Sequence, residues 1–480
     1  MINDTNDIDL STIREALASF EIAPRTEPNE PVDLGRVFFP DGHRNVLDMK
    51  RQLVVGNRGM GKSFWTHALI NPAVRDQLAR DYSFPKLAHT DVVIGFNGSV
   101  KISGVTPTID EIQSAHNADY DPELIWRAVI LRAVRSLSPS GEVLGLLATL
   151  DQLKGRLGNY AEELTSADDM AAGRGTSILI VFDALDRFSH EWGPIRELTK
   201  GLLRTVVGLQ SFNSIRAKVF MRVDQFADTE LFRFPDSSKI RNDRVDLTWQ
   251  AHELYGLLLF ELMRQPRADE VLKKLANRLN VYSALPIRGH MNADPQHLEI
   301  LVRAIAGEFM GKDRKRGRVY TWVPLHLSDA ANNCSPRTFL AAWKTAAEHS
   351  PSPQSQAVDH FGLKEGVRQA SSARLTELRE DYPWIDLALE PLRRHFVPIS
   401  KKELFDLWQE NNVSQRIRDN GGLAPIGVFI DENSQDALLQ TMTSIAVMEM
   451  RANGKINVPD IFRVEAEILR KGGVAVPRKN

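Results

Sequence analysis

The sequence contains little cysteine and few long apolar segments. Its 480 residues include one cysteine, Cys334, so no disulfide can form within the chain and cysteine cannot build a metal site. The longest dense apolar run, Leu254–Met263, contains Glu261 and is far shorter than the roughly 20 residues that span a bilayer. Residues Met1–Asp9 are polar and acidic and lack the apolar core of a signal peptide. We therefore expect a cytoplasmic protein that does not contact a membrane.

The sequence also lacks a strong excess of either charge. Sixty Lys and Arg residues oppose 62 Asp and Glu residues, so the net charge is −2. Non-specific attraction of the whole chain to nucleic acid is excluded, and any such binding requires a local patch. The histidines show neither H-x-x-x-H nor H-E-x-x-H spacing, so we expect no protein-ligated zinc. The hydrophobic fraction of 42% is typical of globular proteins, and the length predicts about three domains.

Composition and periodicity divide the chain into four parts. Residues 1–45 form a leader, and residues 46–248 alternate short β-rich runs with helical periods, which is typical of a parallel α/β sheet. Residues 249–350 have helical periodicity throughout. Residues 357–480 predict helices followed by a short β-hairpin with its turn at Asn453-Gly454. The strands predicted in the second part are Gln52–Val55, Asp91–Phe96, Ser177–Phe182 and Ala217–Val223.

The segment Gly56–Ser63 (GNRGMGKS) matches the phosphate-binding pattern G-x-x-x-x-G-K-[ST]. A predicted strand precedes it and a predicted helix follows it, which is the context that the motif requires. Glycines let backbone N–H groups turn toward a phosphate, Lys62 reaches the β- and γ-phosphates, and the Ser63 hydroxyl is a Mg²⁺ ligand. The predicted nucleotide-binding residues are Gly56, Asn57, Arg58, Gly59, Met60, Gly61, Lys62, Ser63 and Phe64.

The second half of the predicted site is the run Ile178–Asp186 (ILIVFDALD). Its apolar strand ends in Asp183, where a carboxylate that binds Mg²⁺ through water belongs, so we predict Ser63 and Asp183 as the metal residues. Asp186 either orients the attacking water or caps the helix that follows. The strand Asp91–Phe96 lies between the two motifs in sequence, which leaves room for an extra strand between the strand before the phosphate-binding loop and the strand that ends in Asp183.

Polar residues also end the fourth predicted strand. Arg222 there is either a sensor of the γ-phosphate or half of a surface pair with Asp224. A charged run follows, and either one of its cations is an arginine finger for a neighbouring subunit or the run is a solvated segment. Its cations are Arg233, Lys239, Arg241 and Arg244. The sequence has no N-K-x-D motif, so ATP is favoured over GTP as the nucleotide.

These motifs, with the segment Leu247–Trp249, resemble the STAND and KAP-type branch of P-loop ATPases, which is related to AAA+ and origin-recognition ATPases. The resemblance covers roughly residues 45–350. It implies a P-loop NTPase parallel sheet of the additional-strand type, an all-helical lid and a C-terminal winged-helix-like domain. Ala184 stands where KAP-type members have a second Asp and AAA+ proteins have a catalytic Glu. The resemblance therefore implies slow ATP hydrolysis, with ATP acting as a conformational switch.

The same resemblance suggests further roles. Arg337, near the start of a predicted helix, corresponds to the lid arginine that reaches the γ-phosphate, or is simply exposed. The implied partners are a second copy of the chain or a protein effector, as in bacterial anti-phage defence. One alternative is a DNA-acting ATPase, with duplex DNA bound by the winged helix or by the five cations of Gly311–Arg318. Another is a scaffold that binds ATP without hydrolysing it.

Overall fold

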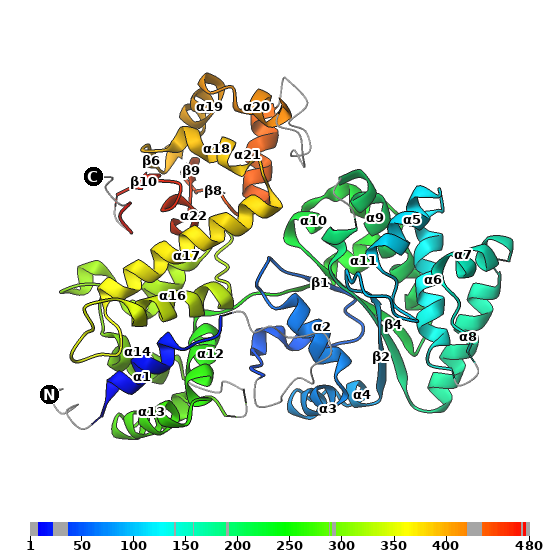
Figure 1. Ribbon diagram of the computed structural model, residues 1–480, viewed down its shortest axis with the longest axis horizontal. Coiled ribbons are helices and arrows are strands. Elements are labelled where there is room, and N and C mark those ends of the chain that lie inside the picture. Colours follow the sequence, from blue (N-terminus) through cyan, green and yellow to red (C-terminus); the bar gives the residue numbers. More distant parts are fainter. Residues whose placement is uncertain are drawn as a thin grey trace. The chain divides into compact units, whose positions relative to one another are not determined.

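The computed structural model describes residues 8–22, 37–138, 141–156, 158–188, 192–287, 289, 294–419, 434–471 and 474–476. The chain divides into two compact units (Figure 1). The first, which we call the sheet unit, comprises Thr26–Leu34 and Gly42–Leu247. The second, the helical unit, comprises Met1–Arg25, Gly35–Asp41 and Thr248–Asn480. The boundary after Leu247 lies next to the predicted boundary at residue 248, whereas the finer division into leader, lid and C-terminal domain stays a prediction. Much of the predicted leader lies outside the described residues.

The sheet unit is built on a five-stranded parallel sheet with the strand order β2-β3-β4-β1-β5. This order confirms the predicted α/β class with an additional strand. The strand between β1 and β3 is β4, whereas the strand of residues 90–96 lies at the edge of the sheet. β5 was not predicted, because two residues are too few to show a pattern. The strands are β1 (Leu53–Val55), β2 (Thr90–Phe96), β3 (Ser177–Phe182), β4 (Ile215–Met221) and β5 (Val245–Asp246).

Helices cover this sheet because its strands are apolar on both faces. In β3, every residue from Ile178 to Phe182 is buried, as expected for a central parallel strand. One face packs against α6 and α9, where the buried Trp126 indole donates a hydrogen bond to the Leu198 carbonyl at 2.8 Å. The α-helices of the unit are α2 (Lys62–Ile70), α3 (Pro72–Asp81), α4 (Pro85–Ala88), α5 (Ile109–Asn117), α6 (Pro122–Arg135), α7 (Leu146–Gly155), α8 (Gly158–Gly173), α9 (Trp192–Gly208), α10 (Val223–Ala227) and α11 (Ser237–Asn242).

The helical unit contains α1 (Leu10–Ala18) and the helices from residue 251 onward. The N-cap of α1 is Asp9, whose carboxylate accepts from the Ser11 amide at 2.9 Å. The helices between residues 251 and 348 agree with the helical periodicity predicted for residues 249–350. The larger helices are α12 (Ala251–Met263), α13 (Pro266–Arg278), α14 (Pro295–Ala306), α15 (Val319–Leu327), α16 (Pro336–Glu348) and α17 (His360–Asp381). Among the described helices, none combines the length and apolarity needed to cross a membrane.

Close contact between α16 and α17 depends on glycine. A Cβ atom at Gly366 would lie 2.2 Å from the Ala342 carbonyl oxygen, and one at Gly362 would lie 2.5 Å from that of Ala346. Since real Cβ atoms do not approach oxygen this closely, only glycine allows the two backbones to pack at this distance.

The C-terminal part of the helical unit has the predicted order of helices and hairpin. Ser400 caps α19 by accepting from the Glu403 amide at 3.2 Å, as predicted. β8 and β9 pair antiparallel around the Asn453-Gly454 turn, and β7 joins them in the order β7-β9-β8. α21 ends at Ser444, and a turn in which Ala446 has a φ of 59° separates it from β8. The elements are α18 (Ile385–Leu389), β6 (Phe396–Val397), β7 (Ile399–Ser400), α19 (Lys401–Glu410), α20 (Val413–Asp419), α21 (Ser434–Ser444), β8 (Glu449–Met450), β9 (Lys455–Asn457), α22 (Asp460–Arg463) and β10 (Leu469–Arg470).

Candidate active site

The predicted phosphate-binding loop connects the end of β1 to the start of α2 in the sheet unit. Gly59 and Gly61 have φ angles of 81° and 105°, in the region that disfavours other residues. A Cβ atom at Gly61 would meet nothing within 4 Å, so this position needs glycine for its backbone conformation and not for space. Gly56 is needed for space and not for its backbone conformation, because a Cβ atom there would lie 3.0 Å from the Cβ atom of Leu247.

Lys62, the first residue of α2, folds back over this loop. Its Nζ atom donates hydrogen bonds to the carbonyl oxygens of Gly56 at 2.7 Å and Asn57 at 3.0 Å. Burial lowers the pKa of Lys62 to about 8, and the charge of Asp183 opposes that shift. Arg222 lowers the same pKa further, whereas Asp186 and Asp224 raise it, so these predicted site residues lie near the amine.

Asp183 lies at the carboxyl end of β3 and is 6% exposed. Its Oδ1 atom accepts from the Ala184 amide at 2.8 Å, and its Oδ2 atom accepts from the Thr66 hydroxyl at 3.2 Å. The sequence analysis missed Thr66, although its spacing of four residues from Lys62 places both on one face of α2. Ser63, in the first turn of the same helix, is exposed.

The donor set of this site fits magnesium. A buried carboxylate at the end of β3 and an exposed hydroxyl in the first turn of α2 are hard oxygen ligands, which Mg²⁺ prefers. Within the described residues, no cluster of three or more His, Cys, Asp or Glu side chains is arranged to hold a metal. A magnesium ion at Ser63 and Asp183 would therefore take its remaining ligands from phosphate and water, which is its usual mode of binding.

Arg222 connects the ends of the adjacent strands β3 and β4. Its Nη1 atom lies 3.4 Å from Asp186 Oδ2, and its Nε atom lies 3.1 Å from Asp224 Oδ1. Arg222 therefore forms an ion pair with Asp224, but the two side chains are only 15% and 11% exposed, so the pair is not on the surface, and the sensor role of Arg222 stays a prediction. The structure also adds the link to Asp186, which lies in the short 3-10 helix Leu185–Arg187. Ala184 precedes this helix in the left-handed conformation, with φ 58°.

Arg337 belongs to the helical unit and lies in the first turn of α16. Ser335 occupies the N-cap position and Pro336 the first helical position, as predicted. The Arg337 side chain is 47% exposed, and its Nη1 atom lies 3.6 Å from Glu377 of α17. Its assignment as a γ-phosphate sensor stays a prediction.

Lys218, in the middle of β4, is a buried charged residue that was not among the predicted residues. Its Nζ atom donates to the carbonyl oxygens of Val46 at 2.5 Å, Asp48 at 3.0 Å and Arg51 at 2.9 Å. Burial lowers the Lys218 pKa to about 7. Because the three carbonyl groups belong to the segment that leads into β1, Lys218 fixes the chain just before the phosphate-binding loop.

Comparison with known proteins gives few matches. No family model matches the sequence, and no curated protein matches it. Solved structures that resemble the chain include the ORC2 protein of Aeropyrum pernix in ADPNP-ADP complexes, with 12% identity, a TM-score of 0.36 and 94% of each chain covered. Cdc6p from Pyrobaculum aerophilum has 12% identity and a TM-score of 0.29, with 92% of this chain and 93% of that chain covered.

Drosophila ORC bound to DNA has 11% identity and a TM-score of 0.31, with 96% of this chain and 92% of that chain covered. These values are too low to carry an argument about family or function. The fold assignment therefore rests on the strand order and on the geometry of the loop between β1 and α2.

Proposed function

We propose that this protein is an ATPase that binds MgATP at the loop between β1 and α2. The observation that carries the proposal is the position of Lys62 in a glycine-rich loop at a helix N-terminus, with the buried carboxylate of Asp183 close by. Backbone N–H groups at a helix N-terminus attract phosphate, and the ammonium group adds a full positive charge. The predicted roles are Lys62 on the β- and γ-phosphates and Ser63 with Asp183 on Mg²⁺.

Slow hydrolysis is part of this proposal. The side chain of Ala184 is a methyl group, which cannot accept a proton from the attacking water as a carboxylate at this position would. Asp186 is the carboxylate that we assign to water positioning, and its ion pair with Arg222 at 3.4 Å would orient it. Arg222 would then couple the presence or absence of the γ-phosphate to the positions of the ends of β3 and β4. A site of this kind suits a nucleotide-controlled switch that acts with a second copy or a partner effector. The further assignment to bacterial anti-phage defence rests on the sequence resemblance alone.

A second candidate function is a DNA-acting ATPase. The observation that favours it is the order of elements β7, α19, α20, α21, β8 and β9, with β7 pairing to the hairpin. A small three-stranded antiparallel sheet packed with helices is the arrangement expected of a winged helix, a fold used for both DNA and protein contacts. A third candidate, a scaffold that binds ATP without hydrolysing it, is compatible with Ala184.

One experiment separates these three functions. ATP hydrolysis by the purified protein is measured with and without duplex DNA. Slow hydrolysis that DNA does not change would support the switch, and hydrolysis that rises with DNA would support the DNA-acting ATPase. ATP binding without hydrolysis would support the scaffold, and no ATP binding at all would contradict all three.

Asp183→Asn tests the magnesium assignment. The amide has the size of the carboxylate but no charge, so we expect hydrolysis to fall by about 100-fold or more, because the Mg²⁺ ion would lose its anionic partner in the protein. Nucleotide binding in EDTA should be retained, since Lys62 and the loop are unchanged. Binding of a fluorescent ATP analogue with and without Mg²⁺ provides the second measurement. An equal loss of binding in both conditions would show that Asp183 acts on the fold of the loop and not on the metal.

The pKa of Lys62 predicts a pH dependence of ATP binding. With a pKa of about 8 in the free protein, Lys62 loses its proton as the pH rises above 8, and phosphate binding must then restore it. We expect the ATP dissociation constant to be level near pH 7 and to rise by up to about tenfold per pH unit above pH 8. Lys62→Arg is the control, because its guanidinium stays charged over this range and its weaker binding should be independent of pH. A level profile in the natural protein would contradict the prediction.

A further inference from the structure

A loop of the helical unit carries unusually many positive side chains. Residues 311–318, which we call the basic loop, contain five cations among eight residues and connect α14 to α15. All five are exposed: Lys312, Arg314, Lys315, Arg316 and Arg318. Arg318 pairs with Glu299 at 2.8 Å. Within the described part of the chain, none of the other four has a carboxylate within ion-pair distance.

The basic loop has a fixed, hydrogen-bonded shape. Phe309 and Arg318 form an antiparallel bridge, and the Met310 amide donates to the Gly317 carbonyl at 2.9 Å. Asp313 accepts from the Lys315 amide at 2.9 Å, which closes a short 3-10 turn over Arg314–Arg316. The stem of Arg316 covers Gly311, where a Cβ atom would lie 2.9 Å from Arg316 Cγ. The loop therefore holds its cations together, so little conformational entropy is lost when an anion binds.

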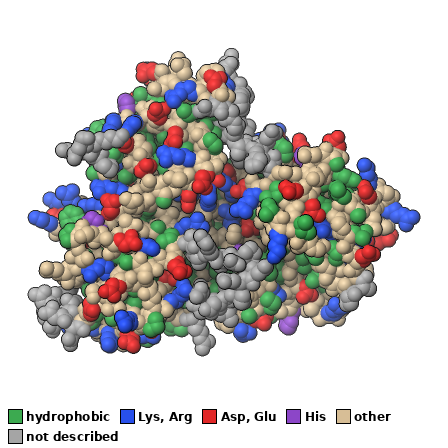
Figure 2. Space-filling view, viewed as in Figure 1, with side chains coloured by type: hydrophobic (Ala, Val, Ile, Leu, Met, Phe, Trp, Pro, Cys, Tyr) green, Lys and Arg blue, Asp and Glu red, His purple; other side chains and the backbone are tan. Residues whose placement is uncertain are grey.

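The first turns of α17 extend this positive surface. Lys364 and Arg368 are four residues apart and so lie on one face of the helix. Burial lowers the pKa of Lys364, and the charges of Arg316 in the loop and Arg368 in the helix lower it further, as expected for neighbouring positive side chains. Arg368 pairs with Glu365 at 3.1 Å. Figure 2 shows Lys and Arg side chains gathered at the left edge of the view, beside the helices α16 and α17 of Figure 1.

We propose that the basic loop and the face of α17 that bears Lys364 bind the phosphate backbone of duplex DNA. Several unpaired cations on a fixed loop suit a ligand with regularly spaced phosphates, and each guanidinium group can bind two phosphate oxygens at once. A membrane surface is less suitable, because insertion needs several exposed apolar side chains and this surface offers Phe361, which is 60% exposed. Single-stranded nucleic acid is also less suitable, because its binding sites stack successive bases on several aromatic rings and this surface offers one.

The proposed contact is with the phosphate backbone, and phosphate contacts carry no sequence information, so it provides affinity and position without sequence specificity. It is separate from the hairpin β8–β9, where a winged helix would place its contact. The inference does not rest on ATP binding, because every residue named for it lies in the helical unit.

The test measures binding of a fluorescein-labelled 30-base-pair duplex of arbitrary sequence by anisotropy, without nucleotide, from low to physiological salt. The main variant is Lys312→Gln, Arg314→Gln and Lys315→Gln combined, and Lys364→Gln is made separately. The matched control is Arg267→Gln, Lys274→Gln and Arg278→Gln combined, which removes three exposed cations from α13 of the same unit. Thermal melting and circular dichroism establish that all variants remain folded.

We expect the natural protein and the control to bind alike, and the loop variant to bind at least about tenfold more weakly. Because each phosphate contact contributes about 0.9 to the slope of log K against log salt, the loop variant should lose about 2 to 3 from that slope and Lys364→Gln about 1. Equal losses in the loop variant and the control would overturn the proposal, as would absence of binding by the natural protein at low salt. Stronger binding to phosphatidylserine vesicles or to polyglutamate than to DNA would overturn it in favour of a membrane or an acidic protein.

Discussion

Replacing Lys62 by alanine is expected to abolish ATP hydrolysis, with a loss of about 100- to 1000-fold, and to weaken ATP binding strongly. The ammonium group places a full positive charge over the loop, where its Nζ atom donates to the carbonyl groups of Gly56 and Asn57. Bound phosphate would take over those two contacts, and a methyl group cannot supply either the charge or the donors. Phosphate release and isothermal calorimetry with ATP are the two measurements.

Lys86→Ala is the matched control for this experiment. Lys86 is an exposed lysine on the short helix α4 of the same unit, so its removal changes the net charge equally. It should hydrolyse ATP like the natural protein. If Lys62→Ala remained folded and bound ATP as tightly as Lys86→Ala, the assignment of the loop as a nucleotide site would be wrong.

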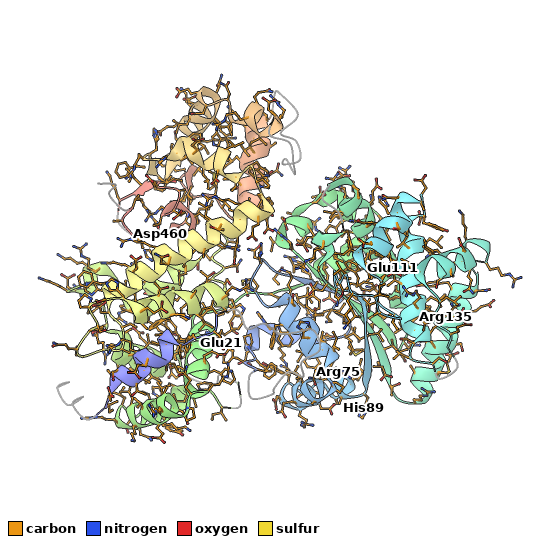
Figure 3. The ribbon with its side chains drawn as sticks, in the orientation of Figure 1. Glu21, Arg75, His89, Glu111, Arg135 and Asp460 are labelled. Carbon is orange, nitrogen blue, oxygen red and sulfur yellow. The ribbon has the colours of Figure 1, made fainter. Side chains whose placement is uncertain are left out.

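The second large effect concerns Asp460, which lies in a buried charged cluster of the helical unit (Figure 3). Its Oδ1 atom accepts from Arg463 Nε at 2.6 Å and from Arg470 Nη1 at 3.3 Å. Its Oδ2 atom accepts from the Val474 amide at 3.1 Å and lies 3.6 Å from His326 Nε2 of α15. Both Asp460 and Arg463 have side chains that are 1% exposed.

Asp460→Ala should therefore destabilise the C-terminal part of the helical unit by about 3–5 kcal/mol, because it leaves the Arg463 guanidinium buried without an opposite charge. Hydrogen exchange measured by mass spectrometry localises the effect, with protection expected to fall in α15 and in residues 455–471. Asp386→Ala is the control, since Asp386 forms a comparable pair with Arg379 at 2.8 Å but is 51% exposed. Its removal should change stability by less than about 1 kcal/mol. Equal exchange in the two variants would show that Asp460 does not stabilise this region.

These two residues differ in how far the sequence predicted them. Lys62 lies in a contiguous motif whose flanking strand and helix are also visible in the sequence, and the structure places it where the motif requires. Asp460 has no recognisable motif, because its partner His326 is more than one hundred residues away. Only packing of α15 against α22 brings the two together, and burial then makes the charge pair important.

The candidate site shows the same division. The sequence predicted Lys62, Ser63, Asp183, Asp186 and Arg222 by their positions at strand ends and at a helix start. It did not show that Arg222 pairs with Asp186, because that depends on β4 lying next to β3 in the sheet. It did not show the hydrogen bond from Thr66 to Asp183 or the three carbonyl groups that hold Lys218. Each of these contacts joins segments that are far apart in the chain.

The sequence by itself determined the class of the sheet unit, four of its strands and the glycine-rich loop at which we place the proposed site, because local patterns of apolar residues and glycines are sufficient for these. The tertiary structure decided the position of β4 between β1 and β3, the close glycine-dependent contact of α16 with α17, and the joining of the basic loop to Lys364 in one positive surface. The physical reason is that electrostatic and packing energies depend on the distance between residues in space. The separation of two residues along the chain predicts that distance only when both lie in the same helix, strand or turn.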